Sequence, residues 1–180
     1  MAITTAPDYT GSVSFEEIWA ILRKTARRQE ETNRQIGKPG GFPGGRFGET
    51  VEYMVVPNLI EKFHELGFIF EKVRQQTVIK DRENNIFTEV DITLENGDKV
   101  MIVEIKSRPA TEDIIYHIER MNKLRLHAGF HGDRRKFLGA VAGMMLNDHE
   151  RRFALKNGFY IIEPSGETFV ITAPFADIIR

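Results

Sequence analysis

Residues 88–106, TEVDITLENGDKVMIVEIK, decide the fold predicted for this chain. Asn96-Gly97 separates two runs in which apolar and polar residues alternate, and this dipeptide is the strongest short-range signal for a β-hairpin. The turn is expected between Leu94 and Lys99. It is expected to be of type I′, because Asn-Gly suits the positive φ angles that both central residues of that turn require.

The strand after the turn carries two charged groups on one surface. Val103 and Ile105 alternate with Glu104 and Lys106. Because successive side chains of a strand point to opposite faces, the apolar pair and the charged pair are expected on different faces. Glu104 and Lys106 are therefore predicted to be neighbours.

The strand before the turn offers a second carboxylate. Val90, Ile92 and Leu94 are expected on one side of it, and Asp91 on the other. A suitable register then places Asp91 beside the charged face of the next strand. The register itself is left open by the pattern.

Two carboxylates and an ammonium group in one place suit metal-assisted hydrolysis. Asp91 and Glu104 supply the hard oxygen ligands that Mg²⁺ or Mn²⁺ prefers, leaving waters for a substrate phosphate. Lys106 is placed to orient or help deprotonate the attacking water and to offset charge on the phosphorane. The alternative is that these residues form only a solvated face or a cross-strand ion pair.

An acidic residue on one strand followed by Glu-x-Lys on the next resembles the signature of the PD-(D/E)XK nuclease superfamily, which includes restriction endonucleases and Holliday-junction resolvases. The matching residues are Asp91, Glu104 and Lys106, whereas Val90 stands where a proline often precedes the aspartate. The resemblance implies a nuclease that hydrolyses phosphodiester bonds in DNA and depends on Mg²⁺ or Mn²⁺.

The family also tends to supply a further glutamate from a helix before the hairpin. Residues 46–54 open such a helix, and Glu49 and Glu52 project from nearly the same face of it. Glu52 is the better match, because its spacing from Gly48 is similar to that in the resolvase-like members, and Glu49 is the fallback. The resemblance thus implies a metal site of Asp91, Glu104 and Glu52. Either helix glutamate is also explained as a first-turn acid that favours the helix N-terminus.

The order of expected elements extends the resemblance over residues 46–180. After the hairpin come a helix that starts at Thr111 and ends before Gly129, a strand, a short helix and a final hairpin. This succession looks like an αβββαβ core of the α/β class, in which helices flank a mixed central sheet. It also resembles a bacterial group of uncharacterised proteins with an N-terminal helical segment. The later elements are expected at residues 137–146, 148–156, 158–163 and 168–172.

Two segments precede this domain. Residues 1–36 are expected to form a helical extension, with a capping box at Ser14 and apolar residues around Trp19. Self-association through this helix is the preferred interpretation, and packing on its own core domain is the alternative. Residues 37–45 are rich in Gly and Pro and predict a linker; no Gly-Lys-Ser/Thr follows, which argues against a nucleotide-binding loop.

Composition favours one substantial core, with 41% hydrophobic residues and 13 phenylalanines. The absence of cysteine excludes disulfides and thiolate metal sites. The start of the chain has no signal-peptide pattern and no apolar run of membrane-spanning length occurs, so a cytoplasmic location is expected. Among five histidines, His127 and His131 are four apart, but Gly129 and Gly132 predict a loop there and no zinc site is expected.

The net charge of the chain is −1, whereas a nucleic-acid-binding protein usually has a basic domain or face. A basic stretch after the motif is the expected site of phosphate contacts, although such a run is often only a solvated surface. Its predicted DNA-binding residues are Arg120, Lys123, Arg125, Arg134, Arg135 and Lys136.

Two further hypotheses stand beside the nuclease. One is a noncatalytic nuclease-fold module that binds DNA or protein and forms a homo-oligomer, and the other is a structural adaptor with a salt-bridged hairpin.

Overall fold

The computed structural model describes residues 20, 24, 58–165 and 168–175. Residues 58–65 are helical and lead into a mixed six-stranded sheet. The remaining elements are β1 (Lys72–Asp81), β2 (Ile86–Glu95), β3 (Lys99–Lys106), α3 (Thr111–Phe130), β4 (Lys136–Gly143), α4 (Asp148–Lys156), β5 (Phe159–Ser165) and β6 (Thr168–Thr172). This is the element order predicted for residues that follow the first helix.

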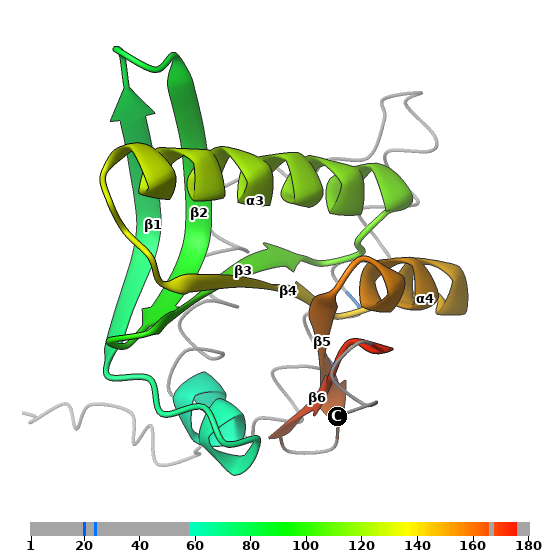
Figure 1. Ribbon diagram of the computed structural model, residues 1–180. Coiled ribbons are helices and arrows are strands. Elements are labelled where there is room, and N and C mark those ends of the chain that lie inside the picture. The colour runs from blue at the N-terminus through cyan, green and yellow to red at the C-terminus, as the bar shows by residue number, and fades with distance from the viewer. Residues whose placement is uncertain (1–19, 21–23, 25–57, 166–167, 176–180) are drawn as a thin grey trace, which may run out of the picture.

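The sheet has strand order β1-β2-β3-β4-β5-β6. β1, β2 and β3 pair antiparallel, β3, β4 and β5 pair parallel, and β6 returns antiparallel to β5. The two parallel connections are made by α3 and α4, because a parallel pair needs a crossover long enough to reach the start of the next strand. In Figure 1, α3 crosses one face of the sheet and residues 58–65 lie beyond the other, with β3 and β4 between them.

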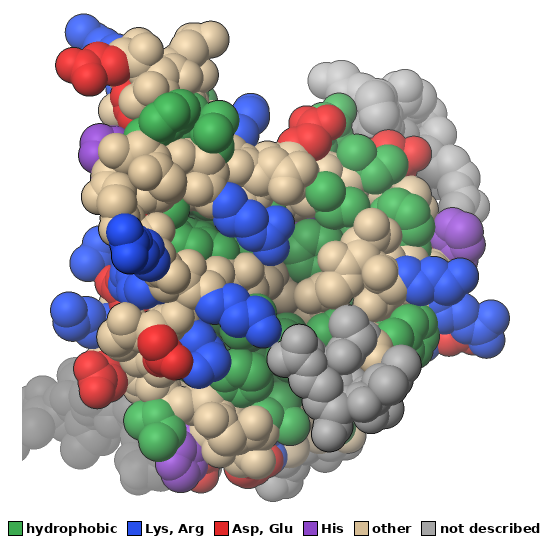
Figure 2. Space-filling view, in the orientation of Figure 1, with side chains coloured by type: hydrophobic (Ala, Val, Ile, Leu, Met, Phe, Trp, Pro, Cys, Tyr) green, Lys and Arg blue, Asp and Glu red, His purple; other side chains and the backbone are tan. Residues whose placement is uncertain are grey.

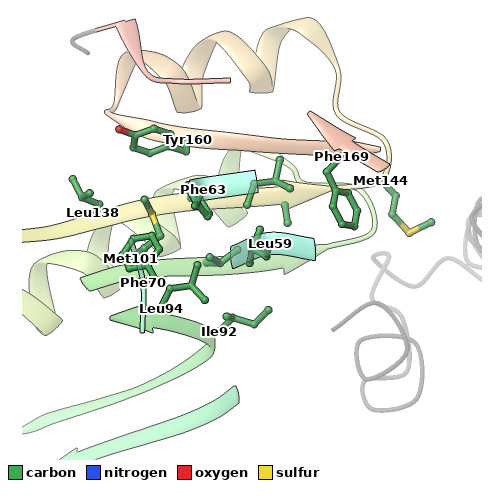
Figure 3. Packing of buried hydrophobic residues seen from close by; sticks show 14 residues of the cluster. Leu59, Phe63, Phe70, Ile92, Leu94, Met101, Leu138, Met144, Tyr160 and Phe169 are labelled. Carbon is green, nitrogen blue, oxygen red and sulfur yellow. The ribbon is translucent and has the colours of Figure 1, made fainter. Parts of the chain in front are cut away.

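Apolar side chains form one core on each face of the sheet. The first core, drawn in Figure 3, packs Leu59 and Phe63 from the helical residues onto Met101 and Val103 of β3. The second packs α3 and α4 on the opposite face of the same strand. Complete burial of one such Leu or Phe contributes about 1.5–3 kcal/mol, so the two cores fix the orientation of β3. The second core includes Ile102, Ile114, Met121, Leu124 and Leu155.

The β2–β3 turn lies where the sequence predicted it, but the predicted type I′ is wrong. Neither Asn96 nor Gly97 has a positive φ. Instead, the Asn96 side-chain oxygen accepts the N–H groups of Asp98 and Lys99 at 3.1 and 2.8 Å. The Asn96 amide also donates to the Ile69 carbonyl at 2.7 Å. The side chain thus satisfies the turn backbone that a type I′ geometry would have satisfied by itself.

The alternation predicted for β2 is broken at Asp91. Ile92 and Leu94 belong to the core of Leu59 and Phe63, whereas Val90 belongs to the core beneath α3. The expectation that all three share one side is therefore wrong. Opposite this point, Gln76 of β1 has a φ of 47°, whereas its neighbours Gln75 and Thr77 pair with Ile92 and Val90. We attribute the change of face to this local distortion of the β1–β2 ribbon.

α3 continues two residues further than predicted and ends at Phe130. His127 therefore lies in the last turn of the helix and His131 caps it, so the loop expected around these histidines is wrong. Glycine inside a helix costs about 1 kcal/mol relative to alanine. Burial of Leu124 and Ala128 in the same part of α3 outweighs the effect of Gly129.

β4 is shorter than predicted and ends at Gly143 instead of residue 146. A Cβ on Gly139 would lie 2.3 Å from a ring carbon of Phe159, so the small residue here makes room for an aromatic ring of β5.

The predicted N-terminal helix, the linker at residues 37–45, and Glu49 and Glu52 lie outside the described residues, apart from Ala20 and Lys24, which are helical and exposed. Within the described parts of the chain, no helix is both long and apolar enough to cross a membrane.

Candidate active site between β2, β3 and α3

The strand pairing brings Asp91 and Glu104 together. Ile92 pairs with Val103, which places the two carboxylate-bearing residues next to this pair at adjacent positions of β2 and β3. Asp91 does not continue the backbone ladder; its Oδ2 accepts the Ile105 N–H at 2.8 Å. The strands therefore diverge at this point, and a carboxylate takes the place of a backbone carbonyl as acceptor.

Glu104 is a buried carboxylate held by two cations. Its side chain is 6% exposed, and Oε1 lies 3.2 Å from the Nζ of Lys106. Its Oε2 accepts from the guanidinium of Arg120 on α3. Burial of a carboxylate requires such partners, because an unpaired charge inside the protein is strongly unfavourable. Asp91, Glu104 and Lys106 thus lie together on β2 and β3.

A cleft of about 400 Å³ lies beside these groups, between the β2–β3 hairpin and α3, and Asp91 is not among its lining residues. Glu104 and Lys106 line it from β3. The rest of the lining comes from β2, with Phe87, Thr88 and Glu89, and from α3, with Asp113, Tyr116, Glu119, Arg120 and Lys123. The two aromatic side chains of the lining are largely exposed: Phe87 is 55% exposed and Tyr116 is 65% exposed.

The electrostatics of the cluster favour a bound cation. Burial, followed by the charge of Glu104, raises the pKa of Asp91 above its ordinary value. Burial by itself lowers the pKa of Lys106, but the charge and hydrogen bond of Glu104, with the charge of Asp91, outweigh it, so that the pKa of Lys106 is raised. Lys106 is consequently an ammonium group at neutral pH, and the two carboxylates repel each other.

The donor set fits a divalent cation with a preference for oxygen ligands. Two carboxylates converge, and a cation between them would relieve the repulsion that raises the pKa of Asp91. Among the described residues, no hydrogen bond reaches the second oxygen of Asp91. Both oxygens of Glu104 are shared with Lys106 and Arg120, so these side chains would have to move or share the carboxylate with an ion.

His117 is a residue of this region that the sequence analysis did not select. It is fully buried on the sheet-facing side of α3, stacks on Phe159 at a centroid distance of 4.8 Å, and its Nδ1 lies 3.4 Å from Arg120. Burial, followed by the charge of Arg120, lowers the pKa of His117 to about 3. The ring is therefore neutral and holds the guanidinium beside Glu104. Its helical spacing from Ile114, Met121 and Leu124 is the signal that could have marked it as a core position.

The six predicted DNA-binding residues are divided among different surroundings. Arg120 and Lys123 line the cleft. Arg125 donates to the Phe137 carbonyl at 3.1 Å, and Arg135 is paired with Asp133 and Glu95. Arg134 and Lys136 are exposed. On the face seen in Figure 2, basic side chains are interspersed with acidic and hydrophobic ones and form no continuous basic surface.

Comparison with known proteins gives likenesses of structure only. No protein-family model and no curated protein matches the chain. A protein of unknown function is 13% identical with a TM-score of 0.45 over 65% of this chain and 62% of its own. A repair endonuclease from Pyrococcus abyssi is 12% identical, with a TM-score of 0.47 over 71% of this chain and 50% of its own.

Can2 from Sulfobacillus thermosulfidooxidans, solved in complex with cyclic tetra-adenylate, is also 12% identical, with a TM-score of 0.47 over 87% of this chain and 54% of its own. The chain thus spans between half and about three fifths of the length of these three structures. At these identities the likeness assigns no residue a role.

The described residues form a mixed α/β sheet flanked by helices, and its elements follow the predicted αβββαβ order. The antiparallel β1–β2–β3 meander, the α3 crossover to parallel β4, and α4 leading to β5 define this core through the chain's own strand pairing.

Proposed function

We propose that this protein is a divalent-metal-dependent nuclease that hydrolyses phosphodiester bonds in DNA, with Asp91, Glu104 and Lys106 at its active site. The observation that supports this most is the convergence of the three groups, with Glu104 and Lys106 lining the cleft, Asp91 next to Glu104, and the pKa values of Asp91 and Lys106 both raised. A salt bridge with a purely structural role would need only Glu104 and its cationic partners, and not the nearby carboxylate of Asp91, whose pKa is raised.

The ion expected here is Mg²⁺ or Mn²⁺, held by Asp91 and Glu104 and, in the resemblance, by Glu52 from outside the described residues. When bound, it supplies Lewis acidity toward phosphate oxygen and water. Lys106, held as an ammonium group, orients the attacking water and stabilises the charge that develops on phosphorus. This charge state favours a role as a hydrogen-bond donor over a role as the base.

Charge in the cleft also supports dependence on a metal ion. Four carboxylates and three basic groups line it, so without a cation the cleft does not favour a phosphodiester. A divalent ion reverses that balance. Arg120 and Lys123 are then available on α3 for contacts to the substrate backbone.

The two exposed aromatic rings favour a nucleic acid over a small phosphate ester. Phe87 and Tyr116 both line the cleft and come from its two walls, β2 and α3. Exposed aromatic side chains that line a binding groove are the usual platforms for unpaired bases. We therefore expect single-stranded or locally opened DNA to bind better than closed duplex.

One observation favours the second candidate, a noncatalytic module that binds DNA or protein. Both oxygens of Glu104 already have cationic partners, Lys106 and Arg120, as in a site where protein charges replace a metal ion. In that case the self-association proposed for residues 1–36 would be the main activity, with DNA or protein bound at the cleft.

Cleavage of a panel of linear, single-stranded, branched and supercoiled DNA in Mg²⁺ or Mn²⁺ distinguishes the candidates. We expect wild type to cleave at least one member and Lys106→Ala to cleave none. Lys99→Ala is the matched control, because Lys99 lies at the other end of the same strand and pairs only locally with Asp98. Binding without cleavage by all three proteins would favour the noncatalytic module.

A further inference from the structure

A second group of possible metal ligands lies away from the cleft carboxylates, where the β1–β2 hairpin meets the end of α3. Nε2 of His131 lies 3.3 Å from Oδ2 of Asp81, and Nε2 of His127 lies 4.0 Å from the same oxygen. One ligand atom from each residue lies within 4.8 Å of the other two. Among the described residues, this is the group of three such side chains that the fold brings together.

Backbone structure explains why the three converge. His127 and His131 are one helical turn apart at the end of α3, so their rings project from the same side and their centroids lie 4.4 Å apart. Asp81 is the last residue of β1. Asn84 in the hairpin turn fixes the Asp81 carboxylate by donating its backbone N–H at 3.1 Å and its side-chain amide at 2.8 Å.

The spacing suits a small ion with tetrahedral ligands. Zn²⁺ binds imidazole nitrogen and carboxylate oxygen at about 2.0–2.1 Å, so two ligands of one ion are about 3.3–3.4 Å apart. The His131–Asp81 distance already has this value, and the His127–Asp81 distance exceeds it by a fraction of an ångström. Rotation of the two imidazole rings would complete the geometry.

Burial distinguishes this group from a surface ion pair. The side chain of Asp81 is 9% exposed and that of His127 28% exposed, whereas His131 is 59% exposed. The carboxylate thus forms the floor of the site, and the exposed ring leaves an entry path. Its hydrogen bonds from Asn84 are the kind of outer-shell support that orients a ligating carboxylate.

We propose that Asp81, His127 and His131 form a second metal site, selective for a borderline transition-metal ion such as Zn²⁺ and distinct from the cleft carboxylates. Two imidazoles and one carboxylate favour Zn²⁺ over Mg²⁺, which prefers oxygen ligands. Three protein ligands leave a fourth position for water. The site does not depend on the nuclease proposal.

Occupancy of this site would tie the hairpin to α3. The hairpin also contributes Phe87 and Glu89 to the cleft, and α3 contributes the facing wall. An ion bridging Asp81 to His127 therefore joins the two walls by a bond that the remaining packing does not supply. We expect Zn²⁺ to raise the melting temperature of the protein and to slow hydrogen exchange in the hairpin.

Calorimetric titration of the full chain with Zn²⁺, and visible absorption with Co²⁺ in its place, test the proposal. Wild type is expected to bind one equivalent at this site, with the intense Co²⁺ spectrum typical of tetrahedral coordination. His131→Ala is expected to weaken binding by about 100-fold, and Asn84→Ala by about 10–100-fold as a positioning residue. His131 is exposed, so its replacement should leave the fold intact, which circular dichroism checks.

Two controls separate this site from others. His149→Ala, on the exposed surface of α4, should bind as wild type does, and so should Glu104→Gln in the cleft. Unchanged affinity in His131→Ala would overturn the proposal, as would the absence of Zn²⁺ binding by folded wild-type protein. Loss of binding in Glu104→Gln with retention in His131→Ala would overturn it in favour of the cleft as the only site.

Discussion

The buried histidine beneath the cleft should make the protein sensitive to mild acid. The pKa of His117 is lowered from 6.5 to about 3 by burial and by the charge of Arg120. Below pH 6.5 the unfolded chain takes up a proton at this position that the folded protein does not. The contribution of neutral His117 to stability is therefore complete above pH 6.5 and is lost progressively as the pH falls toward 3.

The size of this effect follows from the two pKa values. Each unit of difference corresponds to about 1.4 kcal/mol, so the full span is worth about 5 kcal/mol, and the part lost between pH 7 and pH 5 is about 2 kcal/mol. His117→Gln removes the titrating group and should remove this part of the pH dependence. Other titrating groups, including Asp91, are common to both proteins and cancel in the comparison.

Urea denaturation of wild type and His117→Gln at pH 7 and pH 5 measures the difference. We expect the variant to be less stable at pH 7 because of lost packing on Phe159, but to lose about 2 kcal/mol less than wild type between the two pH values. His149→Gln, at an exposed position, should keep the wild-type dependence. Equal losses in wild type and His117→Gln would refute the reasoning.

Three other predictions concern the cleft and the sheet. Asp91→Asn should raise the melting temperature while abolishing cleavage, since burial and Glu104 raise the pKa of the native carboxylate; a lower melting temperature would contradict this. Tyr116→Ala should weaken single-stranded DNA binding by about tenfold in fluorescence anisotropy, as expected for loss of one stacking platform, and unchanged affinity would remove the ring from the interface. Gly139→Ala should cost about 1–3 kcal/mol in denaturant unfolding because of the Phe159 ring, whereas Gly129→Ala, with open space around it and a helical backbone, should stabilise; the reverse order would contradict the packing described.

The local pattern of residues 88–106 predicts the hairpin, but it places Asp91 near Glu104 only for a suitable register, which the strand pairing supplies. Period-two alternation and an Asn-Gly turn are short-range properties that a sequence displays directly. The turn type is not predictable in the same way. The Asn96 side chain accepts hydrogen bonds from the turn backbone and donates one to the carbonyl of Ile69, which is distant in the sequence.

The features that were missed depend on tertiary contacts. Gln76 of β1 has a positive φ opposite Asp91, and Val90 belongs to the core beneath α3; no property of β2 itself indicates either feature. The nearby glycines predict a loop at His127, yet this residue is helical and lies beside Asp81, 46 positions earlier in the chain. The group of Asp81, His127 and His131 therefore forms only when the β1–β2 hairpin folds against α3.

The most direct test of the proposed function separates catalysis from binding at Lys106. Single-turnover cleavage of a DNA substrate in Mn²⁺, together with DNA affinity measured in Ca²⁺, should be compared for wild type and Lys106→Ala. The account predicts a rate at least 100-fold lower in the variant with affinity changed by about threefold or less, because the ammonium group acts mainly on the transition state. Equal cleavage rates in the two proteins would contradict the assignment of Lys106 and, with it, the proposed active site.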